Sequence, residues 1–236
     1  MKTKLLAMMS VVILWTAVPV YAEGAKTFTS SGQILPDERW SNVRIYNDDT
    51  VVDMLGGHVD KMATYDYSIL NVIDGDISTL NAHEFSTANV SGGYVCGLDA
   101  CGNSTVGFSD AAAALSLVAC DSGTVNMTNG TTEYLRAGDS GIINLYGGLV
   151  TNCLDAWDSA TINTYGYGFN YDPIAGSWDG GQLRGFWLDD TRFTIDLYGI
   201  ETYSHINLIP EPSSLILLAL GGLFLKGKRQ FYIKRI

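Results

Sequence analysis

Basic residues are scarce in the body of this chain. Between Glu23 and Glu211 there are seven of them against all 25 acidic residues, a net charge of −18, whereas the whole chain carries −11. Such a surface repels nucleic acid and anionic polysaccharide, so we expect no nucleic-acid partner. The 236 residues include only five prolines but many aromatic, Gly, Asn, Ser and Thr residues. This composition favours strands and turns over helices.

Motifs that carry chemistry are also scarce. The four cysteines form no Cys-x-x-Cys pair and have no histidine at metal-ligand spacing, which argues against a zinc site. The glycines match no phosphate-binding loop, and His58, His83 and His205 lie in no recognisable Ser, Cys or Asp constellation. The sequence therefore predicts no cofactor and no enzymatic activity.

The apolar runs are short compared with the ~20 residues of a membrane-spanning helix. One of them, Leu5–Trp15, follows two lysines and precedes the small-residue pattern Val20-Tyr21-Ala22. This arrangement is typical of a secretory signal peptide. We predict that the Sec export machinery delivers the chain, that signal peptidase removes residues 1–22, and that the mature protein begins near Glu23.

A second apolar run lies near the C-terminus. Pro210-Glu211-Pro212 precedes the run Leu215–Leu225, and five basic residues follow from Lys226 onward. As a helix the run reaches about 16 Å at ~1.5 Å per residue. A bilayer core is roughly 30 Å thick, so this run is a poor permanent span. The basic tip favours the cytoplasmic side, which leaves everything upstream outside.

This order of motif, apolar run and basic tip resembles the PEP-CTERM sorting signal of Gram-negative bacteria, and we assign residues 209–236 to it. The resemblance implies that exosortase, a membrane protease-transpeptidase, recognises Pro210, Glu211 and Pro212. It further implies that the tail is removed and the protein passed to the outer surface or the extracellular matrix, so that the membrane holds it only before processing. Tail removal of this kind is known from other sorting signals. An ordinary C-terminal membrane anchor is the alternative.

The middle of the chain repeats every 18 or 19 residues. The repeats begin at Asp53, Asn71, Asn89, Gly107, Asn126, Asn144 and Asn163. A glycine column contains Gly57, Gly75, Gly93, Gly130 and Gly148 and is interrupted at Ala111. A leucine column contains Met62, Leu80, Leu98, Leu117, Leu135 and Leu154, and an alanine column follows it with Ala82, Ala100, Ala119, Ala137 and Ala156. So many aligned columns indicate a repeat architecture.

A repeat of this length is too short for a helix pair and suits short strands joined by turns. We predict an all-β fold: a single-stranded parallel β-solenoid with 18–19-residue coils and a C-terminal antiparallel β cap. Each column then becomes a ladder with a spacing of about 4.8 Å. Glycine is expected where a turn needs a positive φ, and the leading asparagines are expected to form an amide ladder. A β-sandwich of evenly spaced hairpins is the alternative.

The phase of the repeat divides the chain into segments. We expect an N-terminal cap and initial coil at residues 23–52, solenoid coils at 53–168 and a β-rich cap at 169–208. In the last segment, the alternation from Arg192 to Tyr198 predicts antiparallel strands. Such strands would hide the open edge of the solenoid. A small carbohydrate-binding platform built from the aromatic residues of this segment is the alternative.

Two of the four cysteines occupy the same column. Cys101 and Cys120 follow the alanine column in consecutive coils, so stacking brings their Cα atoms into the ~4.4–6.8 Å range of disulfides. An exported protein can oxidise them. Cys96 and Cys153 lie about three coils apart, roughly 14 Å, which is too far for a bridge. We predict one disulfide, Cys101–Cys120, and two unpaired thiols.

Acidic residues recur at the turn that follows the alanine column, at Asp66, Glu84, Asp121, Asp139 and Asp158. Stacked carboxylates repel one another unless they face water or share a cation. Asp121, Asp139 and Asp158 are therefore candidate calcium ligands, with exposure to water as the alternative. The same three residues are the candidates for polysaccharide cleavage on a β-helix. Residues repeated in register are, however, more typical of structure than of an active site.

The sequence thus predicts an exported, exosortase-processed protein with a structural or adhesive role at the cell surface or in the extracellular polymeric matrix. Exosortase and, as a further candidate, exopolysaccharide are the expected partners. The alternative is a polysaccharide-binding or polysaccharide-cleaving protein on the same scaffold.

Overall fold

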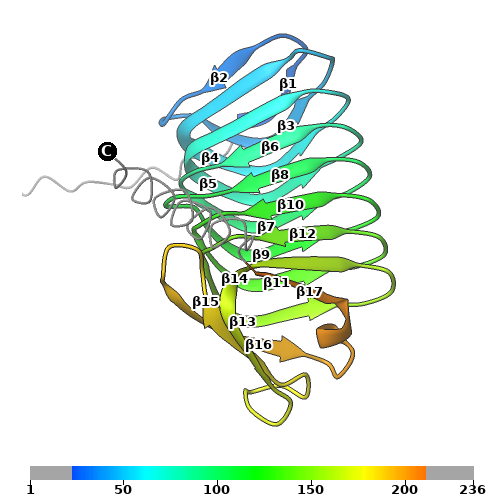
Figure 1. Ribbon diagram of the computed structural model, residues 1–236. Coiled ribbons are helices and arrows are strands. Elements are labelled where there is room, and N and C mark those ends of the chain that lie inside the picture. Colours follow the sequence, from blue (N-terminus) through cyan, green and yellow to red (C-terminus); the bar gives the residue numbers. More distant parts are fainter. Residues whose placement is uncertain (1–22, 211–236) are drawn as a thin grey trace, which may run out of the picture.

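The computed structural model describes residues 23–210, so the predicted signal peptide and all but the first two residues of the predicted sorting signal lie outside the described residues. The described chain is almost entirely β, with one 3-10 turn, η1 (Thr202–His205) (Figure 1). The strands are β1 (Glu23–Phe28), β2 (Gly32–Ile34), β3 (Arg39–Ile45), β4 (Val51–Thr64), β5 (Ile69–Ala82), β6 (Thr87–Val90), β7 (Tyr94–Ala100), β8 (Thr105–Phe108), β9 (Ala113–Ala119), β10 (Thr124–Met127), β11 (Thr131–Ala137), β12 (Ile142–Leu145), β13 (Leu149–Ala156), β14 (Thr161–Asp172), β15 (Gln182–Phe186), β16 (Arg192–Tyr198) and β17 (Ile206–Pro210).

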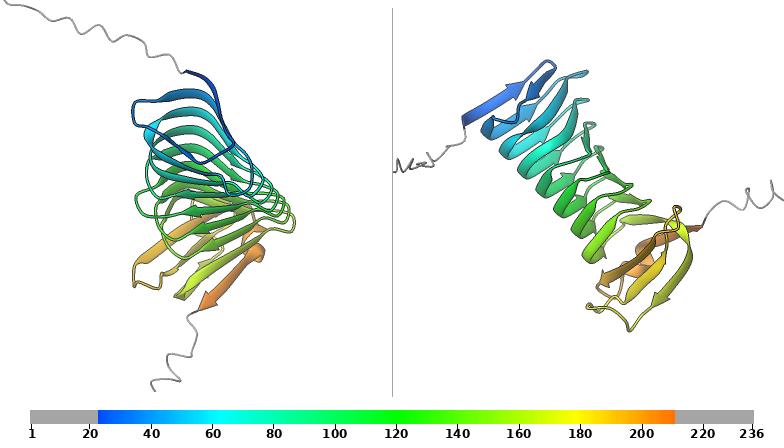
Figure 2. Two further views of the ribbon diagram at one scale, coloured as in Figure 1. Left: turned by 90° about the horizontal axis from the view of Figure 1, so that it is seen from above. Right: turned by 90° about the vertical axis from the view of Figure 1, so that its left-hand side faces the viewer.

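The strands form a stack of about eight parallel coils along one axis (Figure 2). One wall of each coil comes from β7, β9, β11 and β13, each paired in parallel with the next. The other wall comes from β6, β8, β10, β12 and the first half of β14. Register is kept from coil to coil: Thr105 pairs with Thr124, which pairs with Ile142. The predicted parallel β-solenoid is confirmed, because a sandwich of hairpins would pair consecutive strands antiparallel.

The core runs along the inside of the coils. Side chains alternate between interior and surface as the strand pleat requires; in β8, for example, Val106 and Phe108 are buried. The predicted leucine column is at most 1% exposed at Met62, Leu80, Leu98, Leu117, Leu135 and Leu154. Burying each such side chain contributes roughly 1.5–3 kcal/mol. The alanine column is buried as well, from Ala82 to Ala156.

The glycine column lies at a corner of the coils where the backbone of each glycine takes a left-handed conformation. Every member of the column has a positive φ, for example +75° at Gly93. A Cβ added to Gly93 would come within 2.3 Å of the Gly75 carbonyl oxygen in the preceding coil. The strand register corrects the interruption from Ala111 to Ala112, which lies level with Gly93 and Gly130. In this coil the positive φ, +51°, is found two residues earlier, at Asp110.

Stacking begins earlier than the repeat phase indicates. β1 pairs in parallel with β3, and β2 pairs in parallel with β4, so residues 23–52 are already coiled. Their inward residues Ile34, Val43 and Ile45 belong to the same continuous core. The repeat cannot be recognised in the sequence of residues 23–52 because these coils contain neither the glycine nor the alanine column.

The C-terminal segment contains the predicted antiparallel strands and also a further coil. The second half of β14, β15 and β16 pair antiparallel. The chain then returns to the stack: Leu197 pairs with Leu154 of the leucine column, and β17 pairs in parallel with β14. The hairpin is therefore an insertion into a last, irregular coil.

The C-terminal edge of the stack is blunted. The backbone of Leu197 is bonded on its outer side, with Gly180 N–H donating to its carbonyl at 3.1 Å and its own N–H donating to Gly181 at 2.9 Å. The Ile206 N–H donates to the Tyr203 carbonyl, and Pro210 has no N–H. An edge with so few free donors is a poor template for a further strand.

Candidate functional site

The sorting motif begins inside the fold. Pro210, its first residue, is the last residue of β17 and pairs with Gly166 of β14. Glu211 and Pro212 lie outside the described residues. The folded body thus continues up to the motif with no linker between them.

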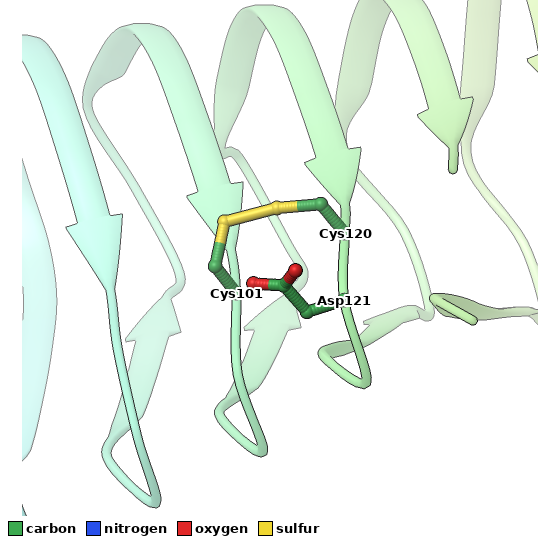
Figure 3. A group of neighbouring side chains, drawn as sticks. All are labelled: Cys101, Cys120 and Asp121. Atoms are coloured by element: carbon green, nitrogen blue, oxygen red, sulfur yellow. A yellow bond between two sulfur atoms is a disulfide. The ribbon is translucent and has the colours of Figure 1, made fainter. Parts of the chain in front are cut away.

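The structure places a disulfide between Cys101 and Cys120, which lie on neighbouring coils with their Cα atoms 4.9 Å apart (Figure 3). Cys96 is partly exposed and Cys153 is buried, and both are free thiols. Burial raises the pKa of the Cys153 thiol, which keeps it protonated. Asp121 brings a carboxylate oxygen within 4.8 Å of the two bridged sulfurs. Sulfur atoms held in a disulfide are not thiolate ligands, so this cluster offers one carboxylate and no thiolate.

The recurrent acidic residues lie in the turns between strands and stabilise them. Asp121, Asp139 and Asp158 each adopt a positive φ of 54° to 58°, which Asp tolerates better than most residues. The Asp139 carboxylate accepts the backbone N–H of Asp121 at 3.4 Å, and the Asp121 carboxylate accepts that of Gly102 at 3.2 Å. Each carboxylate of this pair therefore bonds to the coil before it. This contact gives Asp121 and Asp139 a structural role in the turns.

The predicted amide ladder is confirmed in two runs. In each step the Nδ2 of one coil donates to the side-chain oxygen of the preceding coil at 2.8 to 3.1 Å. The first run is Asp53, Asn71 and Asn89, and the second is Asn126, Asn144, Asn163 and Asn207. Gly107 separates them because it has no side chain. Asn207 shows that the ladder continues into the irregular last coil.

Aromatic side chains form further ladders that the repeat analysis missed. Tyr46 stacks on Tyr65 at 4.8 Å between ring centroids, and Tyr65 stacks on His83 at 5.2 Å. Tyr67 stacks on Phe85 at 5.0 Å in the same turns. The 18- and 19-residue spacings of these rings were a signal that could have revealed them. Because each ring covers a face of its neighbour, these ladders stabilise the turns.

The three histidines lie in three separate places. His58 lies 3.0 Å from Asp60, His83 ends the aromatic stack on Tyr65, and His205 bonds the Ala160 carbonyl at 3.0 Å. They therefore do not combine into one site.

One half-buried carboxyl, that of Asp99, has an unusual environment. Burial raises the pKa of Asp99, an effect that the nearby His83 opposes. Its neighbour in the preceding coil is Asn81, whose side-chain oxygen is buried without a hydrogen-bond partner among the described residues. A protonated Asp99 would be able to donate to this oxygen, which the ionised form could not do.

A groove of 760 Å³ lies between the solenoid and the inserted hairpin. One wall is the glycine corner of two coils, residues 128–131 and 146–150, and the other wall is residues 187–195 of the hairpin. Val150 and Ile195 line it and are buried, whereas Leu149 and Leu188 are 54% and 46% exposed on opposite walls. Sequence analysis missed this groove because its walls are 37 residues or more apart along the chain.

Polar side chains and one open aromatic ring also line the groove. Asp110, Asn129, Asp189 and Arg192 lie along it, together with several threonines. The backbone N–H of Thr191 lowers the pKa of Asp189 and keeps it ionised. Tyr146 is 37% exposed and stacks on Tyr165 at 4.2 Å, which covers one ring face.

Comparison with known protein families shows a likeness at the C-terminal end of the described chain. The PEP-CTERM protein-sorting motif matches residues 208–230, a segment that starts within β17. No curated protein and no solved structure matches the chain.

Within residues 23–210 no helix is long and apolar enough to cross a membrane. The apolar run Leu215–Leu225 lies outside the described residues. The matched motif directs a chain to exosortase and implies C-terminal membrane anchoring before processing. The chain is therefore an exported protein that carries an exosortase-directed PEP-CTERM sorting signal directly behind a β-solenoid.

Proposed function

We propose that the mature protein is a non-enzymatic, structural or adhesive component of the outer surface or extracellular matrix of a Gram-negative-type bacterium. One observation carries the proposal: the polar residues that recur in register bond from coil to coil. The asparagines bond to one another, and Asp121 and Asp139 bond to the backbone of the preceding coil. These groups stabilise a rigid rod.

The same observation argues against polysaccharide cleavage at the acidic column. A catalytic acid or base must reach substrate and usually differs in environment from its partner. Asp121 and Asp139 instead play the same structural role in successive turns.

Calcium remains a separate proposal for Asp121, Asp139 and Asp158. If calcium bridges these carboxylates, the melting temperature rises when calcium is added and falls with a chelator. A melting temperature that ignores both removes calcium from the proposal.

The test of the proposed function compares a deletion strain with strains that produce the wild-type chain or a variant with Pro210, Glu211 and Pro212 all replaced by alanine. Wild-type protein should appear in the surface or matrix fraction with a mass reduced by the tail, and should restore cell cohesion. The motif variant should stay in the membrane fraction at higher mass. Pro173→Ala, in an exposed loop outside the motif, is the matched control and should behave as wild type.

Two results contradict the proposal. If the motif variant restores cohesion as fully as the wild type, surface delivery is not what the function requires. If the purified protein releases reducing ends from a polysaccharide, the role is enzymatic. Polysaccharide binding is the second candidate function, and the groove between the solenoid and the hairpin favours it.

A further inference from the structure

We propose that the groove between the solenoid corner and the inserted hairpin binds a neutral polysaccharide, with the ring of Tyr146 as the platform for a sugar. This inference names the adhesive ligand and so rests on the proposed surface role. Pyranose rings present an apolar C–H face and an edge of hydroxyl groups. They are bound by a flat aromatic or apolar surface beside side chains that donate and accept hydrogen bonds.

The platform is the uncovered face of Tyr146. The position after it in the stack is Tyr165, whose ring lies 4.2 Å away and almost parallel, at 15°. The corresponding position in the preceding coil is Thr128. Met127 pairs with Leu145, and the Tyr146 N–H donates to the Met127 carbonyl, so the next residue, Thr128, lies level with Tyr146. A threonine side chain is too short to cover an aromatic ring. Tyr146 therefore ends its aromatic ladder and opens into the groove, unlike a ring in the middle of a stack.

The rest of the groove complements a chain of neutral sugars. Leu149 and Leu188 give apolar surface on opposite walls, and Asn129, Asp189 and Arg192 supply acceptors and donors along them. A volume of 760 Å³ is in the range of sites for ligands of a few rings, roughly 300–1,000 Å³. The net charge of −18 between Glu23 and Glu211 disfavours an anionic polymer, so the groove suits an uncharged one.

The test is affinity electrophoresis of the protein purified from exporting cells, in native gels that contain dextran, galactomannan, hydroxyethyl cellulose or alginate. At least one of the three neutral polymers should retard the wild-type protein, and alginate should not. Tyr146→Ala removes the platform and should weaken binding roughly tenfold, as truncation of a central aromatic contact does. Tyr67→Ala removes another exposed, stacked ring outside the groove and should bind as wild type.

A second variant closes the same face without removing the ring. Thr128→Leu lays an aliphatic side chain over Tyr146 and presents no new flat ring, so it should weaken binding while the fold keeps its stability. Thermal unfolding of each variant separates lost binding from lost folding. The proposal is overturned if no neutral polymer retards the protein, if alginate alone does, or if both groove variants bind as the wild type. The cohesion and fractionation test of the proposed function is independent of these gels, so either one can fail alone.

Discussion

Because the amide ladder is interrupted at Gly107, the contribution of its hydrogen bonds to the free energy of unfolding can be measured there. Gly107→Asn would place an amide between Asn89 and Asn126, and its Nδ2 would donate to Asn89 while its oxygen accepts from Asn126. A Cβ at Gly107 would lie 3.1 Å from the Asn89 side-chain oxygen, so the Asn89 amide must move by a few tenths of an ångström. The φ of Gly107 is not in the left-handed region, so the backbone accepts a side chain.

The expected gain follows from two new hydrogen bonds. A net hydrogen bond contributes about 0.5–1.5 kcal/mol, and the lower end applies because Asn89 is exposed to water. The two bonds together should add about 1 kcal/mol, or about 2–4 °C in melting temperature for a protein of this size. Replacing glycine also removes backbone freedom from the unfolded chain, a separate contribution of roughly 0.5–1 kcal/mol.

Gly107→Ala is the control because it changes the backbone entropy and adds no amide. Urea unfolding of both variants should show Gly107→Asn more stable than Gly107→Ala by about 1 kcal/mol. With Asn89→Ala in the background, one of the two bonds is lost and the difference should fall by about half. Equal stability of the asparagine and alanine variants would refute the view that the ladder stabilises the stack.

Three further predictions test the glycine corner at Gly93, the Cys101–Cys120 disulfide and the half-buried carboxyl of Asp99. Gly93→Ala should destabilise the fold by more than about 2 kcal/mol in urea, because its Cβ would collide with the preceding coil; Gly97→Ala, whose Cβ would lie 3.9 Å from its nearest neighbour, should change little. Reduction of the Cys101–Cys120 disulfide, which closes a 19-residue separation, should cost about 3 kcal/mol and lower the melting temperature. Because burial raises the pKa of Asp99, its ionisation costs stability as pH rises above the ordinary carboxyl value; Asp99→Asn should therefore stabilise the protein at pH 7, and an equal gain at about pH 3.5 would contradict this.

The regular part of the fold was predictable because successive coils need the same residue types at the same positions. The recurring glycine at the corner, leucine in the core and asparagine in the strand leave a period that one sequence can reveal. The last coil was not predicted, since 25 inserted residues separate Gly166 from Arg192. A fragment of the pattern does survive there, because Ile206-Asn207 repeats Ile162-Asn163.

The candidate sites divide in the same way. Asp121 and Asp139 were visible as a column, but their role in capping backbone N–H groups depends on a left-handed turn that sequence does not display. The groove was invisible because it joins a corner turn near Tyr146 to a hairpin near Leu188, and no periodicity links the two. The sorting motif was readable from the order of its residues alone, because its tripeptide, apolar run and basic tip are consecutive in the sequence.

The pairing of β17 with β14 also determines when folding can be completed. A solenoid coil needs only its neighbours, so the early coils can stack while later residues are still being exported. The last coil needs Ile206–Pro210, and Pro210 is also the first residue of the sorting motif. The final strand pairing therefore forms only after the start of the motif has left the export channel. The fold is thus completed at the same stage of export at which the start of the sorting motif emerges.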